Sequence, residues 1–190
     1  MIPPRRTRAN SRDKILDAAA EIVGEIGAGK LTLDAVAQRA GLSKGGLLYN
    51  FPSKDALLSG MLERMIGESV AEKEALRGRM AGARNLEARL SIAVSLKMRA
   101  GAAQEVASGM LAALAENPGL LDPVRTLIAE EWRVIKATSE DPEAAMLAWL
   151  AVEALGSLDM HGVSPVTAAD RARIEAAVTR LLDHGIKGDG

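Results

Sequence analysis

Apolar residues recur at helical spacing along most of the chain. The first such face begins near residue 15 and follows the i, i+4, i+7, i+8, i+11 pattern of one side of an α-helix, with Ile15, Ala19, Ile22, Val23 and Ile26. Asn10 and Ser11 are candidate N-caps of this helix, and Gly27 and Gly29 end it.

Two short helices and one long helix are predicted next. Thr32 caps a helix that ends at Gly41, Ser43 caps another that runs to about Phe51, and Ser53 caps the long one. The long helix carries an apolar stripe formed by Leu57, Leu58, Met61, Leu62, Met65, Ile66 and Val70. Turn residues rich in Pro, Gly and Asn separate further helices at roughly 84–100, 104–116, 119–138, 142–160 and 167–184. Since no strand-like alternation is present, we expect an all-α fold.

Composition disfavours several classes of protein. The chain has 190 residues, is 48% hydrophobic and has a formal net charge of −1, which is typical of a globular protein. It has no Cys and only His161 and His184, so thiol chemistry is excluded and a histidine metal site is disfavoured. We therefore expect no metal, no cofactor and no enzymatic activity. No apolar run is long enough to span a membrane, and the start MIPPRR lacks the apolar core of a signal peptide, so a cytoplasmic protein without a membrane partner is expected.

Charge is distributed unevenly along the chain. Residues 1–65 contain ten Lys and Arg against seven Asp and Glu, whereas the rest contains 14 against 18. Arg5, Arg6 and Arg8 form a basic N-terminal arm next to two prolines. This distribution favours a polyanion-binding surface near the N-terminus, although chance variation in solvated faces is the alternative.

The segment GLSKGGLLYNFPSK, residues 41–54, is typical of a helix-turn-helix, whose second helix enters the DNA major groove. Leu47 and Phe51 are four residues apart and are expected in the core, with the opposite face free for DNA. Gly45 and Gly46 each cost up to about 1 kcal/mol of helix stability, which is explicable if the backbone approaches a phosphate or base. The candidate DNA-binding residues are Thr32, Ser43, Lys44, Gly45, Gly46, Leu48, Tyr49, Asn50 and Lys54.

Residues 15–58, ILDAAAEIVGEIGAGKLTLDAVAQRAGLSKGGLLYNFPSKDALL, resemble the DNA-binding region of the TetR family of bacterial transcriptional regulators. The resemblance implies that one set of residues anchors phosphates, namely Thr32, Ser43, Tyr49 and Lys54. It places another set near bases, namely Lys44, Gly46, Leu48 and Asn50. Many members of the family have Tyr at the position of Leu48, so the phosphate-binding hydroxyl has either moved to Tyr49 or been lost.

The resemblance also implies two domains and a homodimer. A helix-turn-helix DNA-binding domain with the basic arm is expected at residues 1–52, and a larger helical effector-binding and dimerisation domain at 53–190. Residues 149–182 resemble the final helix pair of a family subgroup, and the apolar faces of this pair suggest a four-helix bundle between two copies. The expected interface consists of Leu147, Leu150, Ala151, Ala154, Leu158, Ile174, Val178 and Leu181. Such a dimer would present two recognition helices about 34–36 Å apart to a pseudo-palindromic DNA operator.

A small-molecule effector is a further implication of the family. The candidate pocket residues are soft or aromatic side chains on the middle helices, namely Met61, Met65, Met98, Met110 and Trp132, and they favour a hydrophobic or aromatic effector. The expected function is a repressor released from its operator by this effector, with activation as the less common mode. The alternatives are a regulator without an effector, and a helical small-molecule-binding protein or enzyme without DNA function, for which Glu130, Glu131, Glu153, Asp159 and His161 are the available groups.

Overall fold

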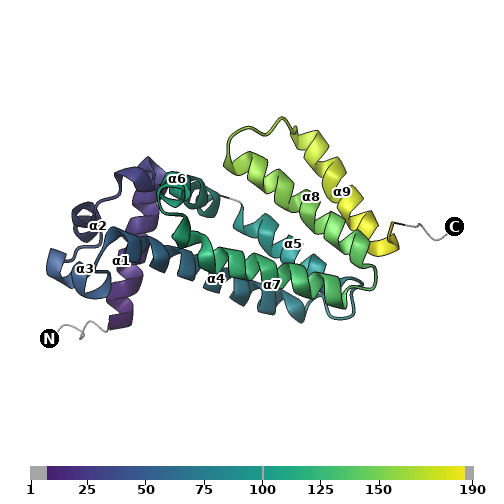
Figure 1. Ribbon diagram of the computed structural model, residues 1–190, viewed down its shortest axis with the longest axis horizontal. Coiled ribbons are helices and arrows are strands. Elements are labelled where there is room, and N and C mark those ends of the chain that lie inside the picture. Colours follow the sequence, from purple (N-terminus) through teal and green to yellow (C-terminus); the bar gives the residue numbers. More distant parts are fainter. Residues whose placement is uncertain (1–7, 100, 187–190) are drawn as a thin grey trace. The chain divides into compact units, whose positions relative to one another are not determined.

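The computed structural model describes residues 8–99 and 101–186, and these contain helices and turns but no strand (Figure 1), which confirms the predicted all-α fold. The elements are α1 (Arg8–Ile26), η1 (Ala28–Lys30), α2 (Leu33–Arg39), α3 (Lys44–Asn50), α4 (Lys54–Arg77), α5 (Leu86–Met98), α6 (Ala102–Glu116), η2 (Pro118–Leu121), α7 (Asp122–Thr138), α8 (Pro142–Met160) and α9 (Ala168–His184). Within the described ranges, no helix is both long and apolar enough to cross a membrane.

Most predicted helix starts are confirmed, and the first is wrong. Thr32 accepts a hydrogen bond from Ala35 N at 3.2 Å, and Ser53 accepts one from Ala56 N at 3.0 Å. By contrast, α1 begins at Arg8, so Ser11 lies inside the helix instead of capping it. Ile26 was expected on the buried face of α1 but is 51% exposed, because it is the last residue before the chain turns at Gly27.

The chain divides into two compact units. One comprises residues 1–65 and 105–123, and the other comprises residues 66–104 and 124–190. The first unit therefore contains the start of α4 and most of α6 besides the three N-terminal helices. The functional division expected at residues 52 and 53 stays a prediction.

The N-terminal unit packs around α1. Its largest fully buried side chains come from α1, α2, α3, α4 and α6, and include Ile15, Leu16, Val23, Val36, Leu47, Leu57, Leu58, Met61 and Met110. Helix α6 approaches α1 so closely that a Cβ atom on Gly109 would collide with the carbonyl oxygen of Val23. A glycine is required at this position because any side chain would push the two backbones apart.

The C-terminal unit packs α5, α7, α8 and α9 around an apolar cluster, with α8 and α9 side by side (Figure 1). The buried members of the cluster are Ala88, Ile92, Ile135, Ala145, Ala148, Trp149, Val152, Val178 and Leu182. Trp132 packs at its edge, with its ring centroid 5.7 Å from that of Trp149 and the two planes tilted by 56°. This geometry is a favourable arrangement for two aromatic rings.

A charged network joins the end of α4 to α5 and α7 in the same unit. The Lys73 ammonium lies 3.4 Å from a Glu87 oxygen and 3.5 Å from a Glu131 oxygen, and it donates a 2.9 Å hydrogen bond to Ser91. Arg77 also pairs with Glu87. The hydrogen bond from Arg77, supported by the charge of Lys73, holds the pKa of Glu87 below its ordinary value.

Asn85, fully buried before α5, ties together three segments of the C-terminal unit. Its side-chain amide donates to the Leu182 carbonyl at 2.9 Å, and its side-chain oxygen accepts from Asp141 N at 3.1 Å. Its backbone N–H donates to Glu140 at 2.6 Å, and this bond lowers the pKa of Glu140. With φ at 54°, the backbone is in the left-handed region, where Asn is better tolerated than most residues.

We expect Asn85→Ala to lower the free energy of unfolding by about 2–4 kcal/mol, because it leaves the Leu182 carbonyl and the Asp141 N–H without their partner and forces Ala into a left-handed conformation. Urea denaturation of the purified protein measures this change. The control is Asn117→Ala, which removes an exposed hydrogen bond to Asp55 and should change the free energy by about 0.5 kcal/mol or less. Equal effects of the two substitutions would contradict the role assigned to Asn85.

Candidate functional site

The turn between α2 and α3 has the backbone geometry of a tight helix-turn-helix. Helix α2 ends in an Ala40–Gly41 turn in which Gly41 has φ at +65°, a conformation that L side chains rarely adopt. Leu42 N donates to the Ala37 carbonyl at 2.9 Å, which closes the helix end. Ser43 then caps α3 by accepting from Gly46 N at 3.2 Å, as the sequence predicts.

Helix α3 is held in place by the burial of Leu47 and Phe51, which are 0% and 4% exposed. The Phe51 ring lies against Gly60 of α4, where a built Cβ would come within 2.6 Å of the ring. The Arg12 guanidinium lies 5.4 Å from the centre of the same ring. The predicted inward face of α3 is therefore confirmed, and α4 fixes its position through a glycine.

The opposite face of α3 is exposed. Tyr49 is 72% exposed and Leu48 36%, and a Cβ on Gly45 would meet no atom within 4 Å. Lys44 forms an exposed ion pair with Asp34 of α2, with its ammonium 3.0 Å from the carboxylate. An exposed pair of this kind is worth about 1 kcal/mol or less, so Lys44 can exchange Asp34 for another anion at little cost.

Asn50 and Gly46 are engaged within α3 itself. The Asn50 amide nitrogen donates to the Gly46 carbonyl at 2.9 Å, and its side-chain oxygen is buried without a partner. The side chain of Asn50 is thus turned onto its own helix, in contrast to the exposed Tyr49. A Cβ on Gly46 would lie 3.3 Å from the Ser43 hydroxyl oxygen, so the absence of a side chain also leaves room for the N-cap.

Three further predicted residues lie at the starts of α2, α3 and α4. The hydroxyl oxygens of Thr32 and Ser43 accept backbone hydrogen bonds, which leaves their O–H groups available as donors. Lys54, at the start of α4, donates to the Gly29 carbonyl at 3.1 Å. These donors suit phosphate oxygens in chemistry, and each is exposed or half-buried.

Arg39 connects α2 to α1 through ion pairs. It was not identified from the sequence as a functional or structural residue. Its guanidinium pairs with Glu21 at 3.1 Å and with Glu25 at 3.0 Å. The hydrogen bond to Glu25, followed by that to Glu21, raises the pKa of Arg39, and the same contact lowers the pKa of Glu25. The i, i+4 spacing of the two glutamates is the only sequence signal of this clamp.

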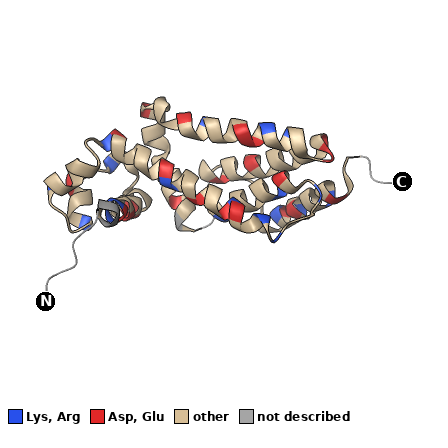
Figure 2. Ribbon diagram, turned by 90° about the horizontal axis from the view of Figure 1, so that it is seen from below, with Lys and Arg blue, Asp and Glu red and all other residues tan. Residues whose placement is uncertain are grey.

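Charges of both signs are interleaved along the helices (Figure 2). Residues 9–65 hold seven Lys and Arg against seven Asp and Glu, so the basic excess of the first 65 residues comes from Arg5, Arg6 and Arg8. Arg5 and Arg6 lie outside the described residues. The polyanion-binding surface predicted from charge therefore depends on the arm together with local positions such as Lys44 and Lys54.

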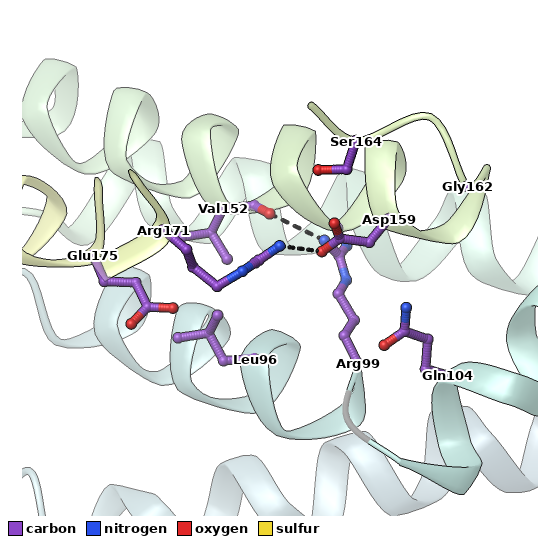
Figure 3. Close-up of a pocket in the computed structure, with 10 residues that line it drawn as sticks. Leu96, Arg99, Gln104, Val152, Asp159, Gly162, Ser164, Arg171 and Glu175 are labelled. Carbon is purple, nitrogen blue, oxygen red and sulfur yellow. Dashed lines mark hydrogen bonds and ion pairs between the residues drawn. The ribbon is translucent and has the colours of Figure 1, made fainter. Parts of the chain in front are cut away.

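The C-terminal unit contains a cavity of about 770 Å³ at one end of α5, α8 and α9 (Figure 3). Its lining consists of Leu96, Arg99, Gln104, Val152, Gly156, Asp159, Gly162, Ser164, Arg171 and Glu175. Of the five predicted pocket residues, Met61, Met65 and Met110 lie in the N-terminal unit, and Met98 and Trp132 in the C-terminal unit. None of the five lines this cavity, so their assignment to a pocket stays a prediction. Within the described residues, no group of three His, Asp or Glu side chains is placed to hold a metal ion.

The predicted interface residues divide between the outer face of the final helix pair and the side that packs on its core. Leu147 and Leu150 of α8 are 52% and 45% exposed, large values for leucines, while Trp149 and Val152 face the core. Ala154 is exposed and Leu158 half-buried, whereas Ala151, Ile174 and Leu181 are half-buried and pack against the core cluster. Val178 differs, because it is buried in the core of its own chain and contributes little surface to an interface.

Comparison with protein families gives two matches that together cover most of the chain. Residues 15–61 match the model described as bacterial regulatory proteins, tetR family, and residues 86–183 match the model described as Tetracyclin repressor-like, C-terminal domain. The second match alone extends over more than half of the 190 residues. The curated HTH-type transcriptional regulator RutR of Escherichia coli (strain K12) is 39% identical over 75 residues, which cover 38% of this chain and 35% of RutR.

Solved structures share the fold at low sequence identity. A TetR-family member from Streptomyces coelicolor A3 is 23% identical with a TM-score of 0.68, and the match covers 90% of this chain and 98% of that one. The multidrug binding protein EbrR, crystallised in complex with imidazole, is 23% identical with a TM-score of 0.65, and the match covers 96% of this chain and 97% of that one.

The contact between Phe51 and Gly60 leads to a test with a matched control. We expect Gly60→Ala to lower the free energy of unfolding by about 1–3 kcal/mol, because the new methyl group displaces the Phe51 ring. Gly67→Ala lies on the same helix with nothing within 4 Å and should instead stabilise it, by up to about 1 kcal/mol. Thermal or urea unfolding distinguishes them, and a stabilising Gly60→Ala would show that Phe51 does not fix α3.

Proposed function

As a member of the TetR family of bacterial regulatory proteins, the chain is a DNA-binding transcriptional regulator, and we propose that it is a repressor that a small-molecule effector releases from its operator. The observation that supports the DNA-binding role most directly is the seating of α3. Leu47 and Phe51 are buried, while the face that carries Leu48 and Tyr49 stays exposed. A helix held in this way projects into a major groove without losing its own core contacts.

We assign the DNA contacts by chemistry and exposure. Thr32, Ser43 and Tyr49 supply hydroxyl groups to phosphates, and Lys54 supplies a charge. Lys44 and Leu48 contact base edges, with Leu48 against a thymine methyl group, and Gly45 and Gly46 let the backbone come close to the DNA. Asn50 contacts a base only after its side-chain amide leaves the Gly46 carbonyl, to which it is hydrogen-bonded.

The basic arm contributes to binding through electrostatics. Because Arg5, Arg6 and Arg8 provide the whole positive excess of the first 65 residues, their contacts with phosphates would strengthen binding to any sequence. Binding should therefore weaken steeply with salt. Such a regulator acts where the DNA lies, in the cytoplasm.

A homodimer built on α8 and α9 accounts for the exposed leucines. Leu147 and Leu150 lie on the outer face of α8, and a groove on α9 is lined by Ile174 and Ala177 between Arg173 and Arg180. Packing these faces against their symmetry mates buries apolar surface that the single chain leaves in water. The resulting two-fold axis matches a pseudo-palindromic operator.

Fluorescence anisotropy with the DNA upstream of the protein's own gene tests the regulatory function. We expect a preference over scrambled DNA of equal length that persists between about 50 and 200 mM salt. Equal binding to both fragments that vanishes at the higher salt would contradict autoregulation at this site.

Two substitutions in the same assay distinguish the roles of Leu48 and Tyr49. Tyr49→Phe removes only a hydroxyl, so it should weaken binding to native and scrambled DNA alike, by about tenfold for one phosphate contact. Leu48→Ala removes a base contact and should reduce the preference for the native fragment. If Tyr49→Phe has no effect, the phosphate-binding hydroxyl is absent from this protein.

The dimer is tested by introducing a charge on the outer face of α8. Leu150→Glu should shift the mass measured by light scattering from twice the 20.0 kDa of the chain to the monomer value, because the interface would bury an unpaired carboxylate. Ile128→Glu, at a similarly exposed apolar position on α7, is the control and should remain dimeric. A dimeric Leu150→Glu variant would place the interface elsewhere.

A further inference from the structure

Three helices of the C-terminal unit change from apolar to charged along a single face. On α9, Val178 and Leu182 are in the core, and one and two turns earlier on the same stripe lie Glu175 and Arg171. On α8, the buried Val152 is followed on its stripe by Gly156 and then Asp159. Because these charged residues continue core-facing stripes, the cavity that they line adjoins the core, and their side chains are half-buried in its wall.

Arg99, at the end of α5, shows the same change and is fixed in place. Its guanidinium donates to the carbonyls of Val152 at 3.0 Å and Glu153 at 3.2 Å, and it pairs with the Glu153 carboxylate. The side chain crosses α8 at Gly156, where a Cβ would collide with it. Arg99 is therefore a neutralised part of the cavity wall, with its charge already paired.

Arg171, the second arginine of the cavity, is also neutralised by an ion pair. The carboxylate of Glu175 remains unpaired. Arg171 reaches from α9 to Asp159 of α8, with the guanidinium 2.6 Å from the carboxylate (Figure 3). Glu175 is one turn further along α9, where it would otherwise pair with Arg171. Its backbone carbonyl accepts a hydrogen bond from Thr179 at 2.9 Å, but its carboxylate has no partner among the described residues. The four charged lining residues sum to zero, and counting Glu153, which pairs with Arg99 from outside the lining, brings the sum to −1, with the unpaired charge on Glu175.

We propose that this cavity binds a small organic cation, with an ammonium group at Glu175 and an apolar portion against Leu96 and Val152. An ammonium donor supplies Glu175 with the charged partner that it lacks. The Gln104 amide and the Ser164 hydroxyl line the same space and accommodate polar substituents (Figure 3). An anion is disfavoured, since it would have to displace Asp159 or Glu153 from its arginine and would face the charge of Glu175.

If the proposed function holds, this cation is the effector. The ligand class follows from the cavity and does not depend on the DNA function. Binding of the cation to the protein and release of the protein from DNA are therefore measured separately. The proposed cation differs from the hydrophobic effector that the sequence predicted from the methionines. The preference for a cation follows from which carboxylates pair with Arg99 and Arg171, and this pairing is visible only in the structure.

Isothermal titration calorimetry of the full-length protein with three probes of similar shape tests the ligand class. The probes are 2-phenylethylamine, 2-phenylethanol and phenylacetate, which present a cation, a neutral group and an anion. We expect the amine to bind about tenfold more tightly than either of the others. Glu175→Gln should lower the affinity for the amine about tenfold and leave that for the alcohol unchanged. Circular dichroism checks that the variant is folded.

Glu143→Gln is the matched control, because Glu143 is an exposed residue of α8 away from the cavity lining and the substitution removes the same charge. It should bind the amine as the unmodified protein does. Tighter binding of phenylacetate, equal losses in the two variants, or no binding of the amine would each overturn the proposal.

DNA anisotropy with saturating 2-phenylethylamine then tests the effector role. Release of the unmodified protein but not of Glu175→Gln from the upstream fragment would support it. If the amine binds in calorimetry but leaves DNA affinity unchanged, the effector role is overturned and the ligand class stands. Failure of the proposed DNA function gives a different result. In that case the protein without amine binds the upstream fragment no more tightly than scrambled DNA.

Discussion

The burial of Leu47 and Phe51 is the contact on which the DNA-binding surface depends. Helix α3 has only seven residues, two of them glycines, and a helix of this length is unstable by itself in water. Its conformation is therefore imposed by the cap at Ser43 and by the two apolar side chains in the core. Since both anchors lie on one side, the other side needs no packing of its own and is free for recognition.

Glycine has three different structural roles in this protein, and each follows from the contacts around it. At Gly41 the backbone requires a positive φ, at Gly60 the Phe51 ring occupies the space of a side chain, and at Gly109 the neighbouring backbone does so. None of these requirements applies to Gly45, because a Cβ there would meet no atom within 4 Å. A glycine that weakens a short helix without a structural requirement is consistent with a surface that another molecule approaches closely.

Ion pairs between helices are part of the scaffold in both units. Arg39 with Glu21 and Glu25, and Lys73 with Glu87 and Glu131, connect helices to one another and have partners on each side. Such networks fix the relative positions of helices within a unit, although each exposed pair contributes little stability. The cavity differs from these networks, because its two arginines pair with other carboxylates and the carboxylate of Glu175 remains unpaired.

The sequence by itself determined the all-α fold, the caps at Thr32, Ser43 and Ser53, and the inward face of α3, because these follow from local spacing and from hydrogen bonds three residues apart. The DNA-binding family was likewise evident from one continuous segment. Tertiary structure decided the rest, since it depends on residues far apart in the chain. Arg171 turns to Asp159 instead of Glu175, and Val178 is buried within its own chain instead of facing a second copy, and both outcomes depend on how α8 and α9 pack.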